Sequence, residues 1–141
     1  MLSQINPLLT GELLAHLDAM GHSDGVVLVD AHFPAQRLAD RCLVMPGIGT
    51  PELLAAVRSV VPPDDAPALD LMRSADGTLL PVQRELVRAA RVDEAQVRHL
   101  ERFEFYEAAG SAYLVVRTGE TRTYGNALLR KGVVTAEEHR T

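Results

Sequence analysis

Two histidines of the chain stand beside features that would allow proton transfer near neutral pH. His22 follows Gly21, which ends a predicted helix, and the negative end of a helix dipole stabilises a protonated imidazole. His32 lies two residues after Asp30 and directly before Phe33, so a carboxylate, an imidazole and an aromatic ring are close in the sequence. A solvent-facing cap histidine and a turn-capping carboxylate are the competing interpretations. Both places are therefore candidates for acid–base chemistry.

Aromatic residues make up only 4% of the chain, and most of them adjoin polar groups. Phe33 follows His32, the rings of Phe103, Phe105 and Tyr106 follow Arg102, and Tyr124 precedes Gly125 and Asn126. A pyranose presents apolar C–H faces and a ring of hydroxyls, which aromatic faces beside Asp, Arg, Asn and His can bind. The alternative is core packing, which we expect for Phe105 and Tyr113. The pattern favours a sugar site.

Several other chemistries lack their motifs. The sequence has no Gly-x-Ser-x-Gly elbow, no phosphate loop with Lys-Ser/Thr and no His-Glu-x-x-His. Gly47 and Gly49 lack the third glycine of a dinucleotide fingerprint, and we interpret them as a turn before a helix. His22 and His32 have no evident third metal ligand, and the lone Cys42 cannot form a disulfide within the chain. We expect no metal and no cofactor.

The composition limits the classes of partner. A formal net charge of −5 disfavours nucleic acid, whose phosphates require clustered Lys and Arg. No apolar run reaches the roughly 18 to 20 residues that cross a bilayer, and the N-terminus resembles no secretory signal. We expect no membrane contact and a cytoplasmic location. The 141 residues fit one domain over residues 1–141, with a frayed tail from about residue 135.

The elements that must position these side chains alternate along the chain. Apolar periodicity and end signals predict helices over 10–20, from 50 onward, over 81–91 and over 103–109. Apolar and β-branched runs predict strands over 26–29, 68–72, 97–100, 112–116 and 123–129. The order predicts a three-layer α/β/α domain with a mixed, mostly parallel sheet, closed by a final strand pair. Asp30 then follows a buried strand, at the sheet edge where ligands bind.

A set of short motifs, taken together, resembles a known family. In one-letter code they are GHSD at 21–24, DAHFP at 30–34, RFEFYE at 102–107, TGE at 118–120 and YGN at 124–126. In order and spacing the set resembles the family of bacterial ribose pyranases and fucose mutarotases, from Ile5 to Val133. The resemblance implies that family's fold and a monosaccharide as substrate.

The resemblance also implies roles for particular residues. His22 is similar to the family's proton donor. The implied sugar-binding residues are Asp30, Arg102, Tyr124, Gly125 and Asn126, with His32 and Phe33 in support. Asp30 would orient the sugar or tune His22, while the base stays open among Tyr124, Asp30 and a bound water. Family members are ring-shaped homo-oligomers, commonly decamers in bacteria, whose sites are completed by a neighbouring subunit.

Within the family, this chain is more similar to the fucose type. The His32–Phe33 pair, Arg102 and Gly125 stand where the ribose type usually has Gly-Leu, a histidine and an alanine. The expected function is that of an L-fucose mutarotase, which interconverts α and β anomers by general acid–base catalysis. The alternatives are a D-ribose pyranase and a non-catalytic monosaccharide-binding accessory of sugar uptake. A nucleotide-binding α/β domain is disfavoured because the phosphate loop is missing.

Overall fold

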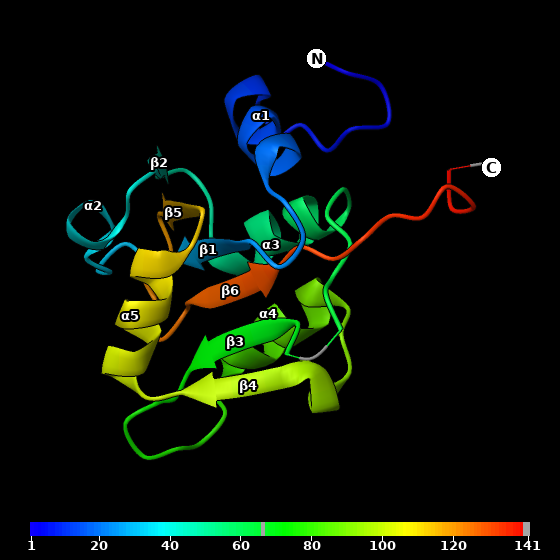
Figure 1. The fold of residues 1–141 in the computed structure, drawn as a ribbon. Coiled ribbons are helices and arrows are strands. Elements are labelled where there is room, and N and C mark those ends of the chain that lie inside the picture. The colour runs from blue at the N-terminus through cyan, green and yellow to red at the C-terminus, as the bar shows by residue number, and fades with distance from the viewer. Residues whose placement is uncertain (66, 140–141) are drawn as a thin grey trace.

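Strands and helices combine into a single mixed sheet with helices on both faces (Figure 1). The computed structural model describes residues 1–65 and 67–139. The strands are β1 (Gly25–Val29), β2 (Cys42–Met45), β3 (Leu69–Met72), β4 (Val97–Leu100), β5 (Leu114–Thr118) and β6 (Ala127–Arg130). The helices are α1 (Gly11–Ala19), α2 (Ala35–Leu38), α3 (Thr50–Arg58), α4 (Pro81–Ala90) and α5 (Arg102–Ser111), and a 3₁₀ turn over Glu94–Gln96 precedes β4.

The strand order in the sheet is β2-β5-β1-β6-β3-β4. The pairs β1–β5, β2–β5 and β3–β4 are parallel, whereas β6 runs antiparallel to both β1 and β3. The prediction of a mixed, mostly parallel α/β sheet is therefore confirmed.

The predicted final strand pair is wrong. β5 and β6 lie on opposite sides of β1, because the segment 119–126 crosses the end of β1 instead of turning back as a hairpin. Residues 123–126, expected in a strand, belong to this crossing. Tyr124 has a left-handed φ of 64° there, which a regular strand does not accommodate.

The predictions also missed α2 and β2. α2 is a single turn of 4 residues, too short to show helical periodicity. β2 is an edge strand of 4 residues whose side chains are half-buried or exposed, so it lacks the apolar run that marks β1. Both lie between residues 34 and 46, where the predictions placed no regular element.

Two hydrophobic clusters hold the helices against the sheet. One lies under α1, α3 and α4 and includes the fully buried Leu13, Leu53 and Leu86. The other lies under α2 and α5 and is centred on Phe105, as expected for that ring. Each such side chain contributes about 1.5–3 kcal/mol by burial. Every residue of β1 is buried, so the sheet has helices packed on both sides of its central strand.

The described ends of the chain lie away from this core. Residues 135–139 are exposed and extend from the body of the molecule (Figure 1). Residues 140 and 141, part of the predicted frayed tail, are outside the described residues. Among the described helices, none is long and apolar enough to span a membrane.

Candidate active site

A pocket of about 300 Å³ opens where β1 and β3 end and α5 begins. From the predicted set it is lined by Asp30, His32, Phe33, Arg102, Tyr124 and Asn126. These residues come from three separate stretches of the chain. The carboxyl ends of parallel strands meet at one edge of the sheet, which is why the stretches converge.

Asp30 is the buried polar centre of this pocket, with 4% of its surface exposed. Its Oδ1 accepts the backbone N–H of His32 at 2.9 Å, and burial raises the pKa of its carboxyl group. The N–H of Asp30 donates to Asn126 Oδ1 at 2.8 Å. Because that N–H can only donate, the amide of Asn126 is oriented with Nδ2 toward the Met72 sulfur, which also lines the pocket.

An aromatic wall and a guanidinium complete the pocket. The rings of Phe33 and Tyr106 meet edge to face at 5.2 Å, and Phe33 also packs against Phe105 in the core. Arg102 is the first residue of α5, and its Nε donates to the Tyr106 hydroxyl at 3.1 Å. Within the described part of the chain, the terminal nitrogens of Arg102 donate no hydrogen bond. They lie at the rim, where a ligand hydroxyl can accept from them.

Gly125 lies buried in the turn between Tyr124 and Asn126 and does not line the pocket. A Cβ atom there would lie 3.0 Å from Glu120 Cγ and 3.1 Å from Thr50 Oγ1. The glycine therefore allows the turn to pack closely on Glu120 and Thr50, between the two pocket residues Tyr124 and Asn126.

His22 does not join the pocket of its own chain. It precedes β1, whereas Asp30 follows it, and a strand of 5 residues spans roughly 16 Å. The expectation that Asp30 could tune His22 is therefore wrong within one chain, because the whole of β1 separates them. His22 is instead a surface side chain, 62% exposed.

The contact partner of His22 is Asp64. His22 Nε2 lies 3.1 Å from Asp64 Oδ1, and the Ser23 hydroxyl donates to Asp64 Oδ2 at 2.7 Å. The hydrogen bonds from Ser23 and from the N–H of Asp65 lower the pKa of the Asp64 carboxyl group. Since Asp64 is then a carboxylate near neutral pH, Nε2 carries a proton in this pair. Nδ1 is left as the second nitrogen that can exchange a proton.

Sequence reasoning missed several residues of these two places. Tyr106, Met72 and Thr123 line the pocket, and Asp64 faces His22. Tyr106 belongs to the motif RFEFYE at 102–107, so the sequence did contain an indication that it lies at the site with Arg102. Asp64 had none, since it lies in a proline- and aspartate-rich segment that reads only as a loop.

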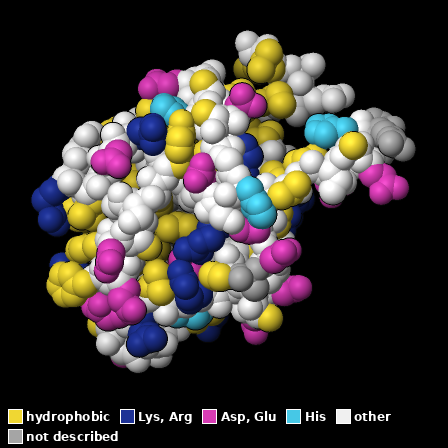
Figure 2. Space-filling view, viewed as in Figure 1, with side chains coloured by type: hydrophobic (Ala, Val, Ile, Leu, Met, Phe, Trp, Pro, Cys, Tyr) yellow, Lys and Arg dark blue, Asp and Glu magenta, His cyan; other side chains and the backbone are white. Residues whose placement is uncertain are grey.

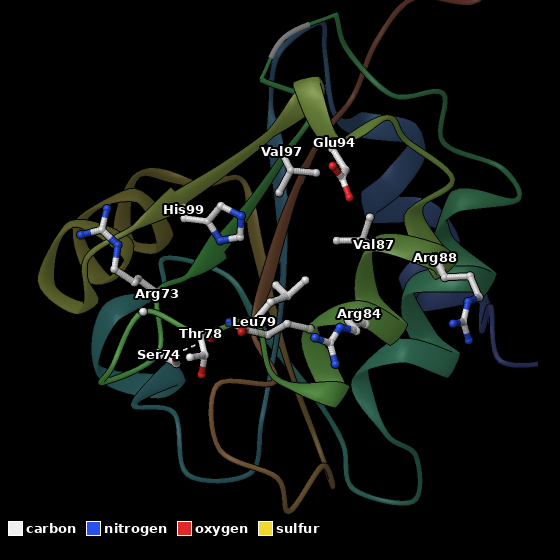
Figure 3. Close-up of a pocket in the computed structure, with 12 residues that line it drawn as sticks. Arg73, Ser74, Thr78, Leu79, Arg84, Val87, Arg88, Glu94, Val97 and His99 are labelled. Atoms are coloured by element: carbon white, nitrogen blue, oxygen red, sulfur yellow. Dashed lines mark hydrogen bonds between the residues drawn. The ribbon is translucent and has the colours of Figure 1, made fainter.

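A larger cavity of about 810 Å³ lies between α4 and β4 (Figure 3). Apolar side chains of Leu79, Val87 and Val97 line it, together with exposed arginines such as Arg84. It contains none of the predicted site residues and lacks a buried carboxylate beside an aromatic ring. The smaller pocket is therefore the candidate site because of the chemical groups that line it, although the other cavity is larger.

The described residues include no group of three or more His, Cys, Asp or Glu side chains placed to hold a metal ion. The thiol of Cys42 is half-buried at the edge strand, and burial raises its pKa.

On the face of the sheet that carries α2 and α5, α5 packs against β3 near Met72, and no described helix lies over the remaining part of β6, β3 and β4 (Figure 1). There the fully buried carboxylate of Asp70 accepts from Arg98 Nε at 3.0 Å and from Arg130 at 2.6 Å. Lys and Arg side chains gather among hydrophobic ones in the middle of this face (Figure 2). The Nη1 atom of Arg130 is buried and has no hydrogen-bond partner among the described residues. This part of the sheet face therefore combines a buried, charged cluster with one arginine nitrogen that lacks a partner among the described residues.

Comparison with known proteins gives consistent matches over nearly the whole chain. An L-fucose mutarotase of Actinobacillus pleuropneumoniae serotype 5b (strain L20) is 41% identical, covering 94% of this chain and 97% of that protein. The crystal structure of the fucose mutarotase from Streptococcus pneumoniae in complex with L-fucose superposes with a TM-score of 0.86 at 33% identity, covering 95% of this chain and 100% of that one.

A more distant structure shares the fold alone. Bacillus subtilis RbsD complexed with D-ribose superposes with a TM-score of 0.76 at 22% identity, over 96% of this chain and 100% of that one. The model of the RbsD / FucU transport protein family matches residues 3–134. The matched range contains every predicted site residue, and on these grounds the chain belongs to the RbsD / FucU family.

Proposed function

We propose that this protein is an L-fucose mutarotase that interconverts the α and β anomers of the free sugar in the cytoplasm by general acid–base catalysis. The observation that carries the proposal is the pocket. In it, the buried carboxylate of Asp30, the amide of Asn126 and the guanidinium of Arg102 lie beside aromatic rings. The L-fucose mutarotase that is 41% identical and the fucose-bound structure support the choice of sugar.

Each pocket residue has a chemical role in this proposal. The Asp30 carboxylate accepts hydrogen bonds from sugar hydroxyls, and Arg102 donates to them from the rim. Asn126 Nδ2 and the Tyr124 hydroxyl provide further polar contacts, while the rings of Phe33 and Tyr106 contact the apolar C–H face. His32 supports the wall. These contacts fix the orientation of the sugar relative to the proton donor.

The reaction needs two proton transfers and one bond cleavage. The acid protonates the ring oxygen while a base removes the proton of the anomeric hydroxyl, and the bond between the anomeric carbon and the ring oxygen breaks. The resulting aldehyde rotates, and closure on its other face reverses both transfers. A positioned acid contributes about 10² to 10⁴ in rate.

We propose His22 as that acid, contributed to the pocket by a second copy of the chain. Within one chain β1 separates His22 from Asp30, so the two can meet only between copies. The part of this sheet face that no described helix covers, where Arg130 Nη1 is buried without a hydrogen-bond partner among the described residues, supports an interface there. A closed ring, with a decamer as the expected size, gives every pocket an identical donor.

The choice of fucose over ribose depends on Arg102. An arginine at the rim can donate to two sugar oxygens at once, whereas the histidine expected in a ribose enzyme is shorter and donates from a single atom. Under the ribose alternative, Arg102→His would improve ribose turnover instead of lowering sugar turnover.

The proposal is tested by anomer exchange measured with NMR magnetisation transfer on L-fucose, D-galactose and D-ribose. The expected result is acceleration of fucose exchange by the wild-type protein and its loss in His22→Ala. Acceleration of ribose pyranose–furanose exchange alone would replace the proposal by the ribose alternative. Sugar binding without acceleration of any exchange would leave a monosaccharide-binding accessory.

A further inference from the structure

The loop between β5 and β6 carries three of the residues that line the pocket, Thr123, Tyr124 and Asn126, but its support lies outside the pocket. The N–H of Glu120 donates to Thr118 Oγ1 at 3.1 Å, and its carbonyl accepts the N–H of Ala31 at 2.9 Å. Thr118 Oγ1 in turn donates to the carbonyl of Val29 at 2.8 Å. The backbone of Glu120 is thus held directly beside Asp30.

The side chain of Glu120 is a buried carboxylate, 7% exposed, that faces away from the pocket. Its Oε2 accepts the N–H of Arg122 at 3.2 Å and Arg122 Nε at 3.0 Å, and its Oε1 accepts Arg122 Nη2 at 3.0 Å. Charge-assisted bonds of this kind are among the stronger ones in proteins. The same Oε1 lies against Gly49, directly before α3, where a Cβ atom would lie 2.9 Å from it. The carboxylate therefore ties the loop together through Arg122 and packs it against the start of α3.

The loop needs such a support because of its backbone. Tyr124 has a φ of 64°, a conformation that costs free energy for a residue other than glycine unless its surroundings impose it. The next residue, Gly125, packs against Glu120 Cγ and Thr50 Oγ1 so closely that a Cβ would lie 3.0 and 3.1 Å from them. The turn that presents Tyr124 and Asn126 therefore rests directly on the Glu120 side chain.

We infer that Glu120 is a positioning residue: its carboxylate, bonded to Arg122 and packed against the start of α3, clamps the loop 119–126 and so holds Asn126 and Tyr124 in their places around the sugar. It acts through those two residues and does not touch the sugar itself. The kinetic part of this inference rests on the proposed function, whereas the conformational part does not.

The chain offers a matched control. Arg122 also pairs with Glu85 of α4, a side chain that is 40% exposed. Glu120→Gln removes the buried charge from the clamp and keeps its shape, whereas Glu85→Gln removes only the outer partner of the same guanidinium. If Glu120→Gln does not fold, Arg122→Gln carries the test, because it removes the same clamp from the exposed side.

The first measurement is hydrogen–deuterium exchange by mass spectrometry on the sugar-free protein. In Glu120→Gln, the segment 119–127 and the amide of Asp30, which donates to Asn126 Oδ1, should exchange about tenfold faster. Glu85→Gln should leave both at the wild-type rate. Unchanged protection in Glu120→Gln and in Arg122→Gln would overturn the inference.

The second measurement separates positioning from a general loss of stability. Glu120→Gln should raise KM for L-fucose about tenfold and change kcat less than about threefold, since binding contacts are lost. In the double variant with Asn126→Ala, the two effects on KM should fall well short of additive. Additive effects, or a loss in kcat alone, would overturn the inference. If the wild-type protein exchanges no sugar, the proposed function fails while the deuterium exchange still decides the role of Glu120.

Discussion

The two ends of β1 differ in how their functional side chains are held. At the carboxyl end, Asp30 and Asn126 are buried, bonded to each other through backbone and amide, and surrounded by core aromatic rings. At the other end, His22 is 62% exposed and is held by one contact to Asp64. In the proposed site, the fold of one chain therefore provides the sugar-binding half and leaves the proposed acid, His22, at the surface.

This difference indicates that sugar orientation and proton donation are provided by separate parts of the proposed site. Groups that orient a sugar must be rigid before it binds, because ordering them afterwards would cost affinity. A proton donor on the surface can be ordered by a second chain at the moment of assembly. Substitutions at the carboxyl end of β1 should therefore lower sugar affinity, whereas substitutions at its other end should lower the rate of anomer exchange.

The largest effect is expected for His22→Ala. The rate of L-fucose anomer exchange should fall about 10² to 10⁴-fold, because the acid is lost. Sugar affinity measured by calorimetry should stay within about twofold, since the pocket is intact. A variant that loses affinity as strongly as rate would place His22 in the binding half and remove the distinction.

The next effect is expected for Asp30→Asn. Sugar affinity should fall about tenfold to a hundredfold, because a neutral amide replaces the acceptor carboxylate. Thermal stability at pH 7 should be unchanged or higher. The reason is that burial raises the pKa of Asp30, so its ionised form costs stability in the folded state. A large drop in the unfolding midpoint would show that the charge supports the fold.

Asp30 also predicts a pH dependence. Sugar binding that depends on its carboxylate is present above the folded-state pKa and is lost as pH falls through that value. Since the pKa is raised from 3.8, affinity should begin to fall at a higher pH than an ordinary aspartate would give. Calorimetric titrations from pH 7 to pH 4 measure this. Affinity that holds constant down to pH 4 would contradict the assignment of Asp30 as the acceptor.

A smaller effect is expected at the other end for Asp64→Asn. Exchange should slow by about tenfold or less, because the imidazole of His22 loses the carboxylate that orients it and fixes its tautomer. Asp65→Asn is the matched control, since that exposed neighbour makes no side-chain contact with His22 in the described structure. Equal slowing in both variants would indicate that the loss of negative charge near His22, and not the loss of an orienting hydrogen bond, causes the effect.

The sequence could predict features that depend on neighbouring residues but not those that depend on contacts between distant segments. β1 has an unbroken apolar run, and α1, α3 and α4 have apolar residues on one face, so local physics identifies them. Asp30 and His32 were identified by their place after such a strand, whereas Arg102, Tyr124 and Asn126 were assigned by the family resemblance. The pairing of β6 with β1 and β3 depends on contacts between distant segments, which a local pattern does not contain.

The contact of His22 with Asp64 and the separation of His22 from Asp30 also depend on distant segments, so no local sequence pattern indicates them. Asp64 meets His22 only because the segment after α3 returns to the start of β1, where Asp64 N–H donates to the carbonyl of Arg130. The separation of His22 from Asp30 follows from the length and direction of β1. Motif order shows that two residues belong to a function but not that they lie at opposite ends of a strand.

The most direct test of a site shared between copies is complementation between two inactive variants. His22→Ala keeps an intact pocket, and Arg102→Ala keeps an intact donor. Co-assembled in equal amounts, they should recover about a quarter of the wild-type exchange rate, because random mixing pairs an intact pocket with an intact donor in about that fraction of sites. No recovery in mixed assemblies, or full activity of a wild-type monomer, would contradict the account.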